Sequence, residues 1–229
     1  MKILIIRPQP GNDASAARAR EAGFEPVQLP FFAIRPRLWD APDPAHFDAL
    51  LVTSANAVRH AGAALSAYRA LPLHAVGRNT ADIAAAAGLP IASIGEGGVA
   101  QAVNAARLAR HKRLLWLAGA DQTDFVAPPD VQIETRITYS SEPAQLPADV
   151  AGIIASADII ALHSARAASS FAEIADSGAL SRDQIRIAAF SKTIADAAGT
   201  GWRGVAIAER PDDQALLSAA RALVKQSAS

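Results

Sequence analysis

The sequence contains no cysteine among its 229 residues, which excludes disulfides, thiolate metal sites and a cysteine nucleophile. Its 22 Lys and Arg residues balance its 22 Asp and Glu residues, and no block of like charge occurs. This argues against a nucleic-acid partner or an anionic membrane surface, so any anion site must be local. No apolar run approaches the roughly 18 residues needed to span a bilayer. We therefore expect a cytoplasmic protein.

The N-terminal apolar run is short and ends at Arg7 without the small-residue cleavage site of a signal peptide. We interpret it as a first strand. Half of the residues, 51%, are apolar, so the chain can bury a core. Its length allows one large domain or two small ones.

Short runs of β-branched and aliphatic residues recur between alanine-rich helical patterns. This alternation predicts α/β units with mainly parallel sheets covered by helices on both faces. A further extended segment, residues 131–147, runs out into a proline-rich connection. The other predicted strands are residues 3–6, 49–52, 73–76, 91–94, 114–117, 159–162, 185–189 and 205–207.

Residues that favour helix N-termini follow most of these strands. The simplest interpretation of each is an N-cap, whose side chain accepts a hydrogen bond from an amide of the first helical turn. In a parallel sheet such turns gather along the carboxyl edge of the strands, where helix N–H groups converge and can bind anions. The predicted caps are Asn12 with Asp13, Ser54, Thr80, Ser164, Thr193, and Asp212 with Asp213.

Part of the chain is repeated. Ser54 and Ser164 are 110 residues apart, and each stands between a strand and a helix. Three matching segments in the same order indicate two homologous α/β lobes. The matched segments are 51–58 with 161–168, 74–81 with 188–195, and 91–109 with 205–224, with Gly88 and Gly201 closing the helices of the second pair.

Two segments, Phe24–Pro36 and Tyr139–Pro147, resemble connections between the lobes. A chain that crosses twice places two linkers side by side, and two lobes that face each other across a hinge form a cleft. We expect this interlobe cleft to be lined by hydroxyls, helix N-termini and one phenol, that of Tyr139. The bases expected there are Arg7, Arg78, Arg166 and Lys192.

Other motifs leave two alternatives open. Gly95–Ala100 matches G-x-G-x-x-A, which would suit a nucleotide-dependent α/β enzyme, but Asp121 is poorly placed to bind a ribose. The five histidines are scattered without an i, i+4 pair, so no metal site is predicted. Neither Ser54 nor Ser164 lies in a G-x-S-x-G motif. The second alternative is a non-catalytic bilobal protein that binds a small anion.

Taken in order, several of these segments resemble the uroporphyrinogen-III synthase family, and the resemblance covers essentially the whole chain. It implies two α/β lobes joined by a two-stranded linker, with lobe one at 1–34 and 144–229, lobe two at 35–143, and linkers near 34–37 and 139–145. The segments that carry it are Ile5-Ile6-Arg7-Pro8, the turn VTSANAV at 52–58, Ala75-Val76-Gly77 with Thr80-Ala81, and Tyr139.

The resemblance also implies a cofactor-free lyase of haem biosynthesis. Such an enzyme closes linear hydroxymethylbilane to uroporphyrinogen III with loss of water, and inverts ring D through a spiro intermediate. The substrate carries eight carboxylates, which helix N-termini and capping hydroxyls can bind without a basic protein.

Tyr139 stands where the family has its tyrosine, so the resemblance implies that its phenol helps the hydroxyl group to leave. A monomer is expected. The substrate-binding residues expected from the resemblance are Arg7, Thr53, Ser54, Ala55, Gly77, Thr80, Ser164, Ala165, Ser191, Lys192 and Thr193.

The second copy departs from the family pattern at one turn. Ser191 stands where a glycine is expected, which puts close backbone approach at this turn in question. The position of Gly201 places Thr193 opposite Thr80, whereas the distance from the preceding strand places Ile194 there. His163 is expected to be a structural histidine.

Overall fold

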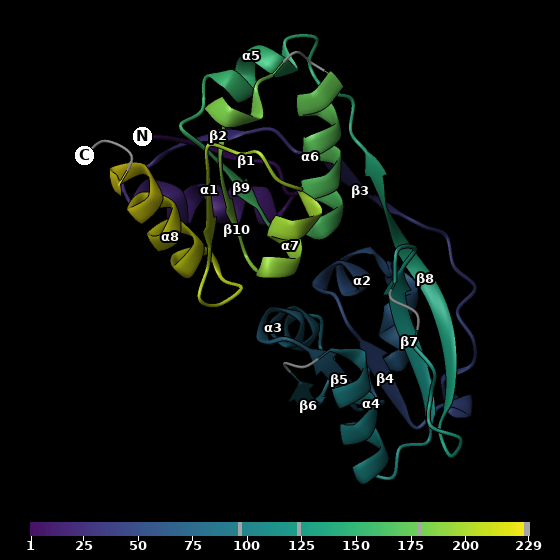
Figure 1. Cartoon of the computed structure of the whole chain (residues 1–229). Coiled ribbons are helices and arrows are strands. Elements are labelled where there is room, and N and C mark those ends of the chain that lie inside the picture. Colours follow the sequence, from purple (N-terminus) through teal and green to yellow (C-terminus); the bar gives the residue numbers. More distant parts are fainter. Residues whose placement is uncertain (96–97, 123–124, 178–179, 227–229) are drawn as a thin grey trace. The chain divides into compact units, whose positions relative to one another are not determined.

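The computed structural model describes residues 1–95, 98–122, 125–177 and 180–226 (Figure 1). The chain divides into two compact units, residues 1–33 with 143–229 (unit 1) and residues 34–142 (unit 2). Each unit has its own mainly parallel sheet with helices around it, which confirms the predicted α/β class. Within the described ranges, no helix is both long and apolar enough to cross a membrane.

Unit 1 is built on a five-stranded parallel sheet in the order β11-β10-β9-β1-β2. Its strands are β1 (Lys2–Ile5), β2 (Glu25–Gln28), β9 (Ile159–Leu162), β10 (Arg186–Ala189) and β11 (Gly204–Ile207). Its helices are α1 (Gly11–Glu21), α5 (Val150–Ala155), α6 (Ala165–Ser177), α7 (Lys192–Ala197) and α8 (Asp213–Gln226), with the 3-10 turn η3 (Arg182–Gln184).

Alternate residues of each strand in unit 1 point to opposite faces of the sheet. Leu4 and Ile160 pack with α6 and α7 on one face, whereas Ile3 and Ile159 pack with α1 and α8 on the other. All four side chains are fully buried. A parallel strand that is covered on both faces needs an unbroken apolar run, which is why these strands could be read from the sequence.

Unit 2 is built on a six-stranded sheet in the order β3-β8-β7-β4-β5-β6. The chain passes from unit 1 to unit 2 within β3 and returns within β8. Its strands are β3 (Phe32–Pro36), β4 (Ala49–Val52), β5 (Leu73–Val76), β6 (Ile91–Gly95), β7 (Arg113–Gly119) and β8 (Gln132–Pro143). Its helices are α2 (Ala55–His60), α3 (Arg78–Ala86) and α4 (Val99–Leu108), with the 3-10 segments η1 (Pro44–His46) and η2 (Ala63–Tyr68).

The core of unit 2 also lies on both faces of its sheet. Leu50 and Leu115 pack with α2, η2 and α3, whereas Leu51 and Leu114 pack with α4. Tyr68 is fully buried in the first of these clusters, and its hydroxyl donates to the carbonyl of Pro42 at 2.6 Å. Tyr68 is therefore a core residue.

The two sheets have the same strand order once the chain is permuted. Unit 1 reads β2-β1-β9-β10-β11, and unit 2 reads β8-β7-β4-β5-β6 over the matching five strands. The three predicted repeats occupy equivalent places, because β4, β5 and β6 correspond to β9, β10 and β11. The repeat extends further than predicted, since β7 and β8 correspond to β1 and β2. Unit 2 is thus a circular permutation of the fold of unit 1.

One predicted connection is partly a strand. Residues 25–28 of the segment Phe24–Pro36 form β2, which pairs in parallel with β1. The sequence EPVQ carries Pro26 and lacks an apolar run, so it does not resemble a central strand. Because β2 lies at the edge of its sheet, a proline without an N–H group is tolerated there.

Two of the predicted helix N-caps are wrong. Asn12 lies inside α1, is fully buried, and donates from Nδ2 to the carbonyls of Ile5 and Arg7 at 2.9 and 2.8 Å. It ties the end of β1 to α1 instead of capping the helix. Thr80 lies in the first turn of α3, which is capped by Gly77 without a side-chain hydrogen bond.

Three predicted caps are confirmed. Ser54 Oγ accepts from the amide of Asn56 at 3.2 Å, and Ser164 Oγ accepts from the amide of Ala167 at 3.3 Å. Asp212 Oδ1 accepts from the amide of Ala215 at 2.8 Å.

The register of the turn before α7 is fixed by its cap. Ser191, not Thr193, is the N-cap, and its hydroxyl accepts from the amide of Ile194 at 3.4 Å. Gly77 holds the same place before α3, so Ile194 stands opposite Thr80. The left-handed glycine that follows α7 is Gly199, with φ of 76°. Pairing Gly201 with Gly88 was wrong because α7 is shorter than α3.

Candidate active site

The strand order of unit 2 reverses between β4 and β7. These strands are neighbours, but the chain leaves β4 toward β5 on one side and leaves β7 toward β8 on the other. Ligands of open α/β sheets bind outside the carboxyl ends of strands at such a reversal, because the connecting segments diverge and leave a crevice. Thr53 follows β4 and Gly119 ends β7, so these residues mark the reversal in this unit.

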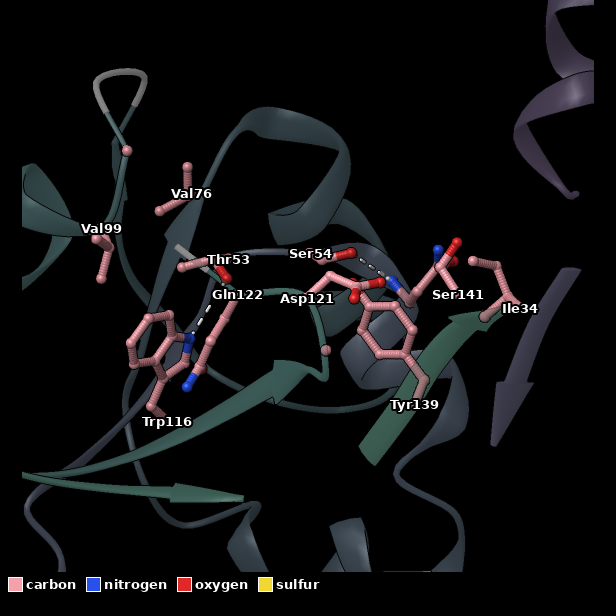
Figure 2. A pocket seen from close by; sticks show the side chains of 13 residues that line it. Ile34, Thr53, Ser54, Val76, Val99, Trp116, Asp121, Gln122, Tyr139 and Ser141 are labelled. Atoms are coloured by element: carbon pink, nitrogen blue, oxygen red, sulfur yellow. Dashed lines mark hydrogen bonds between the residues drawn. The ribbon is translucent and has the colours of Figure 1, made fainter. Parts of the chain in front are cut away.

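A pocket of about 440 Å³ lies at this point (Figure 2). It is formed by the residues that follow β4 and β7, by β8, and by the start of α4. Every described residue that lines it belongs to unit 2. They are Ile34, Thr53, Ser54, Asn56, Val76, Gly98, Val99, Trp116, Gly119, Asp121, Gln122, Tyr139 and Ser141.

Tyr139 enters the pocket from β8. Its side chain is half-buried and packs against the core cluster beneath α2, and its ring centroid lies 6.3 Å from that of His60. Burial and the nearby charge of Arg59 lower the pKa of His60, which favours a neutral ring beside the phenol. Tyr139 is therefore held by packing while it remains open to the pocket.

The ring position of Tyr139 depends on Gly119. A Cβ atom at residue 119 would stand 2.6 Å from Cζ of Tyr139 and 2.7 Å from its hydroxyl oxygen. Real Cβ atoms do not come this close to other atoms, so a side chain here would push the ring away. Gly119 was not predicted as a site residue because it lies at the end of an apolar run.

The turn after β4 supplies two hydroxyls. Thr53 Oγ1 accepts a hydrogen bond from Nε1 of Trp116 at 3.3 Å, and Ser54 Oγ accepts from the amide of Asn56 at 3.2 Å (Figure 2). In both cases the hydroxyl oxygen is the acceptor, so its own proton can be donated elsewhere. The pocket therefore presents hydrogen-bond donors to a ligand.

Charge in this pocket differs from the sequence expectation. Among the described residues that line it, Asp121 is the only charged one and none is basic. Arg78, expected near this edge, is exposed, and its Nε lies 3.9 Å from Oδ1 of Asp82. An anion in this pocket would be bound by hydroxyl, phenol and amide groups.

The other predicted residues of unit 2 lie outside the lining. Ala55 and Thr80 are buried, with 6% and 5% exposure, and Gly77 follows Val76, which does line the pocket. The fingerprint Gly95–Ala100 includes residues 96 and 97, which lie outside the described residues. No group of three or more possible metal-ligating side chains occurs in the described part of the chain.

The corresponding reversal in unit 1 lies between β1 and β9, and it holds a buried polar cluster. The Asp213 carboxylate, 6% exposed, accepts from Ser15 Oγ at 2.9 Å, His163 Nε2 at 3.1 Å and Arg18 Nη1 at 2.8 Å. Burial would raise the pKa of Asp213, but the hydrogen bonds from His163 and Ser15 and the charge of Arg7 lower it to about 2. His163 is buried and bonds Asp213 through Nε2, whereas its buried Nδ1 has no hydrogen-bond partner among the described residues.

Arg7 is bound to this cluster. Its Nη1 donates to Ser15 Oγ at 3.1 Å and lies 3.9 Å from Asp213 Oδ1. Burial lowers the pKa of Arg7, Asp213 opposes this shift, and Arg18 adds to it. Its guanidinium packs against Gly11, where a Cβ would stand 2.6 Å from Nε.

The remaining predicted residues of unit 1 follow the neighbouring strands β9 and β10. Ser164 is an exposed cap followed by Ala165, and Ser191 caps α7. Lys192 and Thr193 are exposed, and Lys192 Nζ bonds both carboxylate oxygens of Asp196 at 2.7 Å. The structure thus groups the predicted residues by unit. Thr53, Ser54 and Tyr139 share one pocket, and Arg7 joins the buried cluster of unit 1.

Trp116, Asn56, Gln122 and Ser141 also line the pocket of unit 2 and were missed. The signal that could have revealed them is topological, because all of them lie on or next to β4, β7 and β8. Recognising β7 as the counterpart of β1 would have placed the reversal, and therefore the pocket, at these residues.

Comparison with known proteins bears on the whole chain. Residues 13–218 match the family model described as uroporphyrinogen-III synthase HemD. The fold is similar to that of uroporphyrinogen-III synthetase from Helicobacter pylori, with a TM-score of 0.65 and 16% identity over 96% of this chain and 98% of that chain. It is also similar to a mutant uroporphyrinogen III synthase from Thermus thermophilus, with a TM-score of 0.56 and 18% identity over 99% of each chain. No curated protein sequence matches the chain significantly.

Proposed function

The chain belongs to the uroporphyrinogen-III synthase family, and we propose that the pocket of unit 2 is where it binds and closes hydroxymethylbilane. The function is that of a uroporphyrinogen-III synthase, an enzyme of haem biosynthesis. The observation that carries the proposed site is that Tyr139, Thr53 and Ser54 line one pocket at the strand reversal. The family match does not favour a non-catalytic anion-binding protein or a nucleotide-dependent enzyme.

The proposed binding of the substrate depends on hydrogen-bond donors of the pocket, because the carboxylates of the substrate can only accept hydrogen bonds. The acetate and propionate groups of the substrate are ionised at neutral pH and can only accept hydrogen bonds. The hydroxyls of Thr53 and Ser54 each accept one bond within the protein, so their protons are available to a ligand. The amide of Gln122 adds donors at the same pocket. A pocket without a base can bind carboxylates in this manner, as a neutral protein requires.

The proposed role of Tyr139 is to assist the loss of water. The C–O bond of the hydroxymethyl group breaks, the oxygen takes a proton from the phenol and leaves as water, and an electrophilic azafulvene that still carries its N–H proton remains beside the phenolate. The pyrrole nitrogen supplies the electron pair that expels the oxygen, so a weak acid is sufficient. Elimination of water places the enzyme among the lyases.

Ring inversion requires control of the substrate's shape. Ring D attacks the azafulvene through its substituted carbon to form the spiro intermediate. The bond from that carbon to the bridge with ring C then breaks, and the free α-carbon of ring D bonds to the bridge and loses its proton to the phenolate, which gives isomer III. Closure without this control gives isomer I. We propose that the pocket contributes by holding the bilane so that the substituted carbon is the one in reach.

The residues of unit 1 form a second proposed group of substrate ligands. These are Arg7, Ser164, Ala165, Ser191, Lys192 and Thr193, with Ala55, Gly77 and Thr80 retained for unit 2 on the resemblance. We also propose that the enzyme needs no cofactor, that it acts as a monomer, and that it is cytoplasmic.

The test is a product assay. Hydroxymethylbilane is generated in the presence or absence of the purified protein, the products are oxidised to uroporphyrins, and isomers I and III are separated by chromatography. We expect isomer III to dominate only when the protein is present. An unchanged isomer ratio at every protein concentration would refute the function.

A further inference from the structure

Trp116 lies at the junction of the core and the pocket. It sits on β7 directly opposite Leu51 of β4, and its indole packs with Ala102, Val103 and Ala106 of α4. The residue is 5% exposed, yet it lines the pocket. Packing on this helix fixes the plane of the indole, and therefore the direction of its N–H group.

The indole N–H reaches the Thr53 hydroxyl. Nε1 of Trp116 lies 3.3 Å from Oγ1 of Thr53, and Figure 2 shows the bond between the two side chains at the pocket. A buried indole N–H requires an acceptor, because leaving it unpaired costs free energy. Thr53 supplies that acceptor. Its β-branched side chain has few rotamers, so the two groups hold each other in one arrangement.

This bond decides what the Thr53 hydroxyl can do. An indole nitrogen is a donor only, whereas a hydroxyl has one proton and two lone pairs. Once Trp116 occupies a lone pair of Thr53, the hydroxyl proton remains for another partner. Within the described residues that proton meets no acceptor, so a ligand in the pocket is its natural target.

We infer that Trp116 is a positioning residue that holds the Thr53 hydroxyl so that it donates its proton to a carboxylate of the substrate. The inference rests on the proposed function of this pocket. Because the described lining holds no basic side chain, each aligned donor contributes a large share of the binding of an ionised acetate or propionate group.

The experiment removes the indole N–H while keeping an aromatic side chain at residue 116. Trp116→Phe should raise the KM for hydroxymethylbilane about tenfold and change kcat less than twofold, because ground-state binding is lost without a change in the acid. Thr53→Val should do the same, whereas Thr53→Ser should retain a near-normal KM. The double variant should have a KM no higher than that of Thr53→Val alone, because both substitutions remove the same interaction.

A matched control is available in the same unit. Trp39 Nε1 donates to the carbonyl of Ala61 at 2.9 Å away from the pocket, so Trp39→Phe should leave KM unchanged. If Trp116→Phe does not fold, β-(3-benzothienyl)alanine at residue 116 keeps the volume of the indole and replaces only its N–H group with sulfur. Thermal unfolding of each variant confirms that folded protein is assayed.

The outcomes separate this inference from the function itself. If the unaltered chain forms isomer III but the N–H replacement leaves KM unchanged, the role of Trp116 is refuted and the function stands. Additive losses in the double variant would also refute it, since the two residues would then act independently. If the unaltered chain forms no isomer III, the function fails and the inference fails with it.

Discussion

The phenol ring of Tyr139 occupies the space that a side chain at residue 119 would need, with only 2.6 Å between its Cζ and the place of a Cβ on Gly119. The two residues lie on the paired strands β7 and β8, where Gly119 is the partner of Tyr139 just after an irregularity in the register. A backbone without a side chain is therefore part of how the proposed acid is positioned.

Gly119→Ala should impair catalysis more than folding. The added methyl group must displace the Tyr139 ring, and a shift of about 1 Å in a catalytic group can cost roughly 100-fold in rate. We expect kcat to fall about 10- to 100-fold, measured as the initial rate of isomer III formation. Gly204→Ala is the control, since it adds the same methyl group in strand β11, against side-chain atoms of Leu223. Equal activity of the two variants would contradict the positioning role of Gly119.

The two tyrosines provide a matched pair with opposite expected effects. Tyr139→Phe removes the proposed acid from a half-buried position, so kcat should fall about 100-fold while the free energy of unfolding stays within about 0.5 kcal/mol. Tyr68→Phe removes a buried hydrogen bond to Pro42, so it should cost about 1–2 kcal/mol of stability and leave kcat intact. Urea unfolding and the isomer assay on both variants measure the two effects, and full activity of Tyr139→Phe would remove its assigned role.

Asp213 should contribute strongly to the stability of unit 1. Asp213→Asn leaves Arg18 without its buried anion and disrupts the bonds from Ser15 and His163, so we expect a loss of roughly 3–5 kcal/mol in the free energy of unfolding. Asp196→Asn is the control, because that carboxylate is 60% exposed and its bond to Lys192 should be worth under about 1 kcal/mol. Chemical denaturation measures both variants. Similar losses in the free energy of unfolding would show that the buried cluster stabilises the fold no more than an exposed ion pair does.

The Asp213 carboxyl should also make the stability of the fold depend on pH in acid. Its pKa is about 2 in the folded chain and 3.8 ordinarily, so the folded state holds fewer protons than the unfolded state in this range. Its contribution is complete above pH 3.8 and is lost as the pH falls toward about 2. Asp213→Asn should remove this part of the acid dependence, and an unchanged acid transition would contradict it.

His74 should make stability depend on pH in a higher window. Its Nδ1 lies 2.7 Å from Ser93 Oγ and its Nε2 lies 2.9 Å from His111 Nδ1. Burial, and then the charge of His111, lower the pKa of His74 to about 4 from an ordinary 6.5. The unfolded state therefore binds more protons, and stability is lost as the pH falls from 6.5 to about 4.

Replacing His74 tests this directly. His74→Asn should give a flatter dependence of the unfolding midpoint on pH between about 4 and 6.5, although the variant is less stable at neutral pH. His46→Asn, at an exposed position, should retain the slope of the unaltered chain. A slope that survives in His74→Asn would assign the effect to other groups.

Some elements could be read from the sequence because their physics is local. Strands such as β4 and β9 need an apolar run to be covered on both faces, and Ser54 and Ser164 are caps because a hydroxyl after a strand suits a helix start. Strand β2 was not recognised, because an edge strand with Pro26 needs no such run. Asn12 resembled a cap, but its amide is needed by two carbonyls that the fold brings to it.

The residues of the candidate site also fall into two groups, those that the local sequence predicts and those that it does not. Thr53, Ser54 and Tyr139 carry polar groups at places where a pattern predicts an open strand end. The proposed roles of Trp116 and Gly119 depend on side chains that the neighbouring strands bring close to them. The sequence does not show that β7 lies between β4 and β8. Their roles depend on strand order, and that order is a property of the whole sheet.

The split course of the chain has a consequence for its synthesis. Strands β1 and β2 leave the ribosome first, but β9, which pairs with β1, follows only after all of residues 34–142 have been made. The embedded unit is complete and contiguous by then, so it can fold while the earlier strands still lack most of their sheet. A nascent chain stalled once residues 34–142 have left the ribosome should accordingly contain an ordered middle and an N-terminal segment that chaperones can still bind.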